Sequence, residues 1–180
     1  MRHVALLRGI NVGGKNRLPM PTLVALFEQA GAKRVATYIQ SGNVVFDAPA
    51  RTAARLAAEM PRRIEEATGL SVPVVLRSGA ELEAVIRESP LLARGVDPDT
   101  IHVAFLADAP TPEGIRRLGG AVATVGVDTY ELHGRELHLH CPQGIGKSKL
   151  TNAYFDSRLG TVSTMRNLRT VKALVELART

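Results

Sequence analysis

The sequence GIGKSKL, residues 144–150, contains residue types that hold phosphate groups in many proteins. Glycine lets main-chain N–H groups come close to a ligand, and lysine supplies a positive charge. The letters GKS also match the end of a P-loop, whose pattern is G-x-x-x-x-G-K-[ST]. In this chain the first glycine of that pattern is replaced by Cys141, and Pro142 after it has no N–H to offer. We therefore expect an anion-binding loop here, but not a P-loop.

The residues after this loop favour an anion for a second reason. We expect Ser148 to begin a helix that runs to Arg158, because unpaired N–H groups and the helix dipole at such a start attract negative charge. Lys147 and Lys149 would add to this field. The alternative is a flexible loop in which the serine only caps the helix.

Another glycine-rich loop, GINVGGKNRLP, occupies residues 9–19 and follows an apolar strand predicted near the N-terminus, over residues 3–8. In a ferredoxin-like plait this loop and the turn Ser41-Gly42-Asn43 lie at the same end of the sheet, so we expect them to face each other. The alternative is a loop that the Asn and Gln side chains order for structural reasons alone. The candidate ligand-binding residues here are Asn11, Gly13, Gly14, Lys15, Asn16, Gln40, Ser41 and Asn43.

Strand directions predict partners for the loop at residues 144–150 as well. A strand over residues 161–165 should end at the same end of its sheet as the strand that precedes residue 144. We therefore expect Lys147 and Arg166 to serve one anion site, with Asn167 capping the last helix beside them. The candidate residues of this site are Gly144, Gly146, Lys147, Ser148, Lys149, Arg166 and Asn167.

The apolar patterns predict the elements that position these residues. In the first half, strands are predicted over residues 3–8, 34–40, 44–47 and 73–77, with helices over 19–30, 52–68 and 79–88; Pro61 should kink or split the second helix. In the second half, strands are predicted over 101–107, up to 133, 136–141 and 161–165, with helices over 111–118, 148–158 and 168–178. The fold class is α+β, with two ferredoxin-like (split βαβ) plait halves, residues 1–90 and 91–180, and extra helices.

The composition predicts the cellular location of the protein and the kinds of partner it could have. The chain has no run of about eighteen apolar residues, and its one cysteine excludes an internal disulfide. We expect a cytoplasmic protein with no membrane contact, no cofactor and no obligate protein partner. Residues 1–27 carry four basic and no acidic side chains, and residues 141–180 carry seven basic and two acidic ones. Such ends either keep the surface soluble or attract an anionic partner.

Five side chains of the second half could bind a metal ion. Strand alternation places them on one face of a hairpin, and three histidines with two carboxylates suit zinc. The same pattern is typical of a solvated sheet face, which we favour, and we expect no metal site. These residues are Glu131, His133, Glu136, His138 and His140. No hydrolase, metalloprotease or dinucleotide motif is present, so no catalytic residue is predicted.

Four stretches carry a family resemblance: LLRGINVGGKN (6–16), YIQSGNVVF (38–46), GIGKSKL (144–150) and MRNLRTVKAL (165–174). Together they resemble the bacterial family called domain of unknown function 1697, over the whole chain. The resemblance implies two ferredoxin-like halves and supplies no established activity, so it does not tell whether the protein is an enzyme.

The hypothesis that follows is a protein that binds a phosphate-bearing ligand, either a nucleotide or a nucleic acid backbone, through its basic glycine-rich loops. One alternative is an enzyme that acts on a small anionic metabolite polarised by Asn11, Lys15 and Ser41. Another is a structural or interaction module without a ligand.

Overall fold

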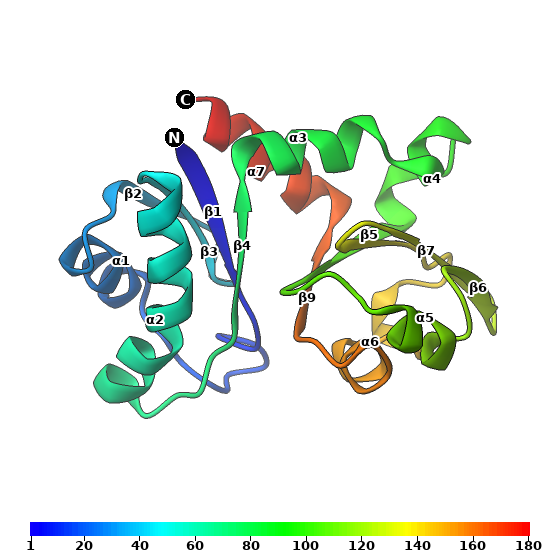
Figure 1. Cartoon of the computed structure of the whole chain (residues 1–180), viewed down its shortest axis with the longest axis horizontal. Helices are drawn as coiled ribbons and strands as arrows, with labels where there is room; N and C mark the ends of the chain where they lie inside the picture. Colours follow the sequence, from blue (N-terminus) through cyan, green and yellow to red (C-terminus); the bar gives the residue numbers. More distant parts are fainter. The chain divides into compact units, whose positions relative to one another are not determined.

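The computed structural model describes residues 1–180, which form two compact units (Figure 1). One unit contains Met1–Leu82 together with Leu174–Thr180, and the other contains Glu83–Ala173. The helices α3 (Gly79–Arg87) and α7 (Leu168–Arg179) each include residues of both units.

The first unit is built on a four-stranded antiparallel sheet of order β2-β3-β1-β4. Two helices, α1 (Met20–Gln29) and α2 (Ala50–Thr68), cover one face of it (Figure 1). Its strands are β1 (Arg2–Leu7), β2 (Lys33–Tyr38), β3 (Asn43–Asp47) and β4 (Val74–Ser78). The order and the β-α-β-β-α-β succession are those of a ferredoxin-like plait, as the sequence predicted.

The helices of this unit are held by narrow apolar stripes. On α2, the buried residues Ala53, Leu56, Met60 and Ile64 follow helical spacing and pack into the same core as Phe27 and Phe46. Pro61 lies inside α2, which continues through it as one helix, so of the two outcomes expected for this residue the split does not occur. The proline removes one main-chain hydrogen bond, but the buried stripe continues on both sides of it.

The second unit repeats the plait and adds one strand. Its five-stranded antiparallel sheet has the order β6-β7-β8-β5-β9, in which β6 is the addition at the edge. The helices α5 (Pro112–Leu118) and α6 (Asn152–Leu159) pack on one face of it through Leu118, Phe155 and Leu159. Its strands are β5 (Ile101–Leu106), β6 (Val122–Val125), β7 (Asp128–His133), β8 (Glu136–His140) and β9 (Ser163–Asn167).

Strand register assigns each residue of this sheet to a face. Ala104 pairs with Leu137 and Met165, and these three side chains belong to the core under α5 and α6. Val103 pairs with His138 and Arg166, which therefore lie on the opposite face.

The remaining elements are short, and none is a membrane span. They are α4 (Pro90–Ala93) and the 3₁₀ turns η1 (Pro98–Thr100) and η2 (Ile145–Lys147). A small cluster of Leu91, Ile101 and Leu168 joins α4, β5 and the start of α7. No helix in the structure combines the length and the apolar character that crossing a membrane requires.

Candidate functional site

The glycine-rich loop at residues 9–19 contains a miniature hairpin. Val12 and Lys15 form an antiparallel bridge, and the N–H of Lys15 donates to the carbonyl of Val12 at 3.0 Å. Gly13 and Gly14 between them have φ angles of 57° and 75°. Two consecutive residues with positive φ make the tight turn that suits a two-residue hairpin, and glycine adopts it without strain.

Two asparagines close the base of this hairpin with their side chains. The Nδ2 of Asn11 donates to the main-chain oxygens of Leu18 at 3.0 Å and Gln40 at 2.8 Å, and its Oδ1 accepts from the N–H of Leu18 at 2.9 Å. The Nδ2 of Asn16 donates to the carbonyl of Gly9 at 2.8 Å. These amides hold the loop in shape, as the structural alternative expected, and they already have partners within the protein.

The turn after β2 meets this loop closely. Gly42 is buried with φ of 78°, its carbonyl accepts from the N–H of Leu7 at 2.8 Å, and an added Cβ would lie 2.7 Å from the Cβ of Leu7. The Nδ2 of Asn43 donates to the carbonyl of Tyr38 and to the hydroxyl of Ser41. The predicted contact of the loop with residues 40–43 is therefore present in the structure. The packing at this contact leaves no space for a side chain at Gly42.

The tip formed by the loop and the turn presents charge and apolar surface to solvent. Lys15 and Arg17 are exposed, and neither forms an ion pair. Val12 and Ile39 beside them are 65% and 51% exposed. The sequence singled out the lysine from its loop, but it gave no signal for the two aliphatic side chains.

The glycine-rich loop at residues 144–150 departs from its expected form at Ser148. This residue is extended rather than helical, and α6 begins only at Asn152, where Thr151 is the N-cap and accepts from the N–H of Tyr154. The hydroxyl of Ser148 instead donates to Asp128 at 2.6 Å and accepts from the N–H of Leu150. The expected helix start at Ser148 is wrong, because the serine is used to tie the loop to the first residue of β7.

The glycines and lysines of this loop are open to solvent. Gly144, Gly146, Lys147 and Lys149 are exposed, and neither lysine forms an ion pair. Cys141 at its start is buried, and burial raises the pKa of its thiol. The loop thus offers two ammonium groups on a glycine-containing turn, without a helix N-terminus beside Ser148.

Arg166 is not brought to Lys147. The ends of β8 and β9 do lie at the same end of the sheet, since both strands run antiparallel to β5. However, Ser148 is tied to β7, and β8 and β5 separate β7 from β9, a distance of about 14 Å at ~4.8 Å per strand. Asp128 also lies on the face of Tyr130, whereas Arg166 lies on the face of His138.

Arg166 is also enclosed, with 8% of its surface exposed. Its Nη1 donates to the hydroxyl of Thr164 and the carbonyl of Met165, at 2.9 and 2.8 Å. Burial lowers the pKa of Arg166 to about 10, so the side chain stays charged at neutral pH. The idea of one anion site shared by Lys147 and Arg166 is therefore corrected: the strand directions were right, but Arg166 lies on the face opposite to Asp128, to which Ser148 ties the loop of Lys147.

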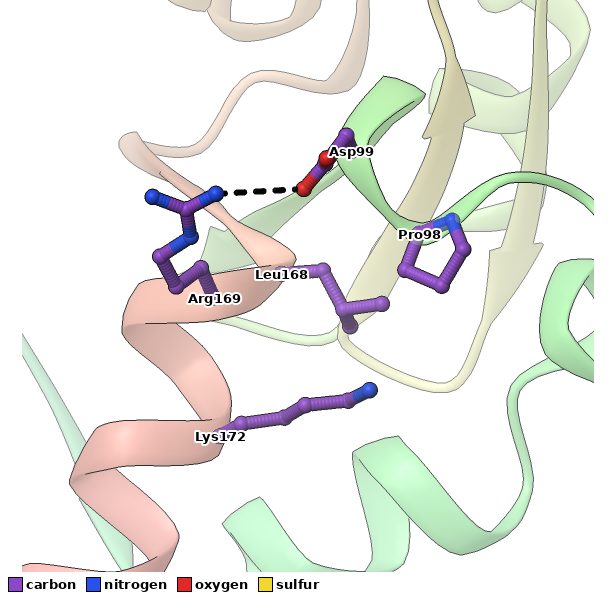
Figure 2. Close-up of a pocket in the computed structure, with 5 residues that line it drawn as sticks. All are labelled: Pro98, Asp99, Leu168, Arg169 and Lys172. Carbon is purple, nitrogen blue, oxygen red and sulfur yellow. Dashed lines mark hydrogen bonds and ion pairs between the residues drawn. The ribbon is translucent and has the colours of Figure 1, made fainter.

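A small pocket lies at the start of α7, where Asn167 caps the helix by accepting from the N–H of Thr170 at 2.8 Å. Its volume is about 170 Å³, and Arg169 forms an ion pair with Asp99 across it at 3.4 Å (Figure 2). Figure 2 shows Lys172 extending along the side opposite this pair. The pocket is lined by Pro98, Asp99, Leu168, Arg169 and Lys172. The sequence predicted the Asn167 cap but not Lys172, although both fall in the stretch MRNLRTVKAL.

The hairpin histidines share a face as expected, but this face is not uniformly solvated. Glu131 pairs with His138, and His133 pairs with Glu136. His138 is only 2% exposed, which corrects the expectation of an open polar face, and Arg94 forms an ion pair with Glu131. Burial, helped by the neighbouring His133, lowers the pKa of His138 from 6.5 to about 4. No group of three or more His, Cys, Asp or Glu side chains is arranged to hold a metal ion.

Comparison with known proteins places the chain in a family. The model of the family described as "Protein of unknown function (DUF1697)" matches residues 1–138, which include the stretches at 6–16 and 38–46. No curated protein matches the chain. Among solved structures, conserved bacterial protein SP0830 from Streptococcus pneumoniae is similar, with a TM-score of 0.74 at 20% identity over 99% of this chain and 98% of that one. This likeness concerns the fold, and the family match covers most of the chain. The protein is therefore a member of the DUF1697 family.

Proposed function

We propose that this protein binds a phosphate-bearing ligand through the exposed lysines of its glycine-rich loops, and that the ligand is a nucleic acid backbone rather than a single nucleotide. We also propose that the protein is located in the bacterial cytoplasm, where a free, buried cysteine such as Cys141 is common. Anion binding of this kind needs no catalytic group, so the proposal is a binding protein and not an enzyme.

The distribution of the lysines carries this proposal. Ion pairs in the protein are made by arginines, whereas all five lysines are exposed and in none of these pairs. Four of the five lie in or beside the family stretches, at Lys15, Lys147, Lys149 and Lys172. The fifth, Lys33, lies at the start of β2, at the opposite end of the first sheet from the hairpin tip. Unpaired exposed ammonium groups are the usual contacts to phosphates, because they release counterions on binding.

The state of the other polar side chains favours a backbone over a defined small molecule. The Nδ2 groups of Asn11 and Asn16 and the hydroxyl of Ser148 could have donated to a particular ligand, but they donate to acceptors within the protein. The charged groups at the loop tips are lysine ammonium groups on flexible stems, which attract phosphates without reading the rest of the ligand. The two loops lie in different units, and each offers its own contact.

Fluorescence anisotropy with labelled oligonucleotides tests this function. We expect affinity to fall with salt, and the log–log slope to drop by about 0.7 to 0.9 for each phosphate-contacting lysine that is removed. The variants are Lys15→Gln and the double change Lys147→Gln with Lys149→Gln, and Lys33→Gln is the matched control. An affinity that depends little on salt, or an equal loss with Lys33→Gln, would contradict the proposal. Tighter binding of a mononucleotide than of an oligonucleotide would point to the small-ligand alternative.

A further inference from the structure

Ile39 has a backbone conformation that isoleucine seldom adopts. Its φ angle is 50°, in the left-handed region, where a β-branched side chain is strained. Glycine or asparagine would occupy this turn position at lower cost. The side chain is 51% exposed, so the free energy gained by its burial offsets only part of the strain energy of the backbone. An exposed aliphatic residue at a strained position indicates a role outside folding.

Val12 lies on the segment that meets this turn. It precedes the Gly13-Gly14 turn of the hairpin and is 65% exposed. The bond from Asn11 Nδ2 to the carbonyl of Gln40 joins the residue before Val12 to the residue after Ile39. Two exposed aliphatic side chains are therefore held on neighbouring segments of one tip.

Cations accompany this apolar pair. Lys15 ends the hairpin turn and Arg17 follows it, both exposed and without ion-pair partners. A surface that combines apolar contact with positive charge complements a ligand that has apolar faces on an anionic backbone. Nucleic acid with exposed bases has this composition.

We propose that the hairpin tip binds single-stranded nucleic acid, with Val12 and Ile39 against unpaired bases and with Lys15 and Arg17 against the adjoining phosphates. This rests on the proposed function and names the form of nucleic acid. In a duplex the base faces are stacked and paired, so only the phosphates would meet the tip. Two aliphatic side chains are also few for stable attachment to a bilayer, which takes a larger apolar insertion or a lipid anchor.

The experiment compares four probes by anisotropy and co-sedimentation: a short oligothymidylate, a duplex of the same length, an abasic strand of the same length, and vesicles containing phosphatidylserine. The test variant is Val12→Asn with Ile39→Asn, since asparagine is polar and tolerates the positive φ of position 39. The matched control is Val122→Asn with Val127→Asn, which changes two valines of similar exposure, 65% and 56%, in the second unit.

The wild-type protein should bind oligothymidylate about tenfold more tightly than the abasic strand, the gain expected from burying roughly 55 Å² of apolar surface against the bases. The test variant should lose this preference but keep its affinity for the abasic strand and a melting temperature at least as high as that of the wild type. The control variant should keep the preference. Equal affinity for oligothymidylate and the abasic strand, or an unchanged preference in the test variant, would overturn the inference while leaving backbone binding intact.

Two other outcomes are distinct. Failure to bind any oligonucleotide at low salt would reject the proposed function as well as this inference. Vesicle binding that the test variant loses, in the absence of any preference for bases, would show that the tip contacts a membrane and would also overturn the inference.

Discussion

The side-chain amide of Asn11 lies 2.8 Å from the main-chain oxygen of Gln40 and joins the glycine-rich hairpin to the turn after β2. The same side chain bonds both polar main-chain atoms of Leu18. One residue thus fixes three segments, and two family stretches that are far apart in sequence become one surface.

Replacing Asn11 should therefore cost stability as well as local order. Asn11→Ala removes three hydrogen bonds and leaves alanine at φ of 54°, so we expect a loss of about 3 kcal/mol in the free energy of unfolding. Asn16→Ala, with similar φ and one side-chain bond, should cost about 2 kcal/mol. Urea denaturation measures both. If Asn11→Ala were no more harmful than Asn16→Ala, the bond to Gln40 would have little weight.

Gly42 should tolerate no side chain. Gly42→Ala would place a Cβ 2.7 Å from the Cβ of Leu7 and 2.9 Å from the Cδ1 of Ile10, at φ of 78°. We expect a loss of about 3 kcal/mol or more, since backbone strain and overpacking add. Gly13→Ala has similar strain but open space, and it should cost only about 1 kcal/mol. Thermal and urea unfolding of both variants would show whether close packing, rather than φ alone, requires glycine at position 42.

Ser148 should matter for stability and not for ligand binding. Ser148→Ala removes the 2.6 Å bond to Asp128, which is 6% exposed, so the carboxylate would lose a partner while buried. We expect a loss of about 1–3 kcal/mol in unfolding free energy. Oligonucleotide affinity should stay unchanged, and the exposed Ser157→Ala serves as the control. Unchanged stability with weakened binding would instead restore Ser148 to the anion site.

His138 should make the protein less stable in mild acid. Its pKa is lowered by burial from 6.5 to about 4, so below pH 6.5 the unfolded chain takes up a proton that the folded protein does not. Stability should therefore fall as the pH drops from about 6.5 to about 4, by up to about 3 kcal/mol, and this contribution should change no further below pH 4.

The pH dependence can be assigned with a variant. In His138→Gln the fall in urea midpoint between pH 6.5 and pH 4 should be clearly smaller than in the wild type. A residual slope is expected, because burial also lowers the pKa of His3 and of His102. The same slope in both proteins would show that His138 is accessible to protons in the folded state.

Much of the fold could be predicted from local patterns. The continuous apolar run of β1 and the apolar stripe on α2 depend on neighbours in sequence, so the β-α-β-β-α-β order of the first plait followed from such patterns. The meeting of the Asn11 loop with Gln40 also followed, because a plait fixes at which end of the sheet each loop lies. Pro61 does not split α2, since the packing that keeps this helix continuous comes from the rest of the core.

The sequence by itself determined the α+β class, the strand directions and the placing of lysines in glycine-rich loops. Only the tertiary structure decided which polar groups face a ligand. Ser148 could have capped a helix, but Asp128, twenty residues away in sequence, takes its hydroxyl. Arg166 reached the expected end of the sheet on the face opposite to Asp128, because side chains alternate at every residue and strand direction does not fix that phase. The exposure of Val12 and Ile39 likewise depends on how two turns meet, which no local pattern records.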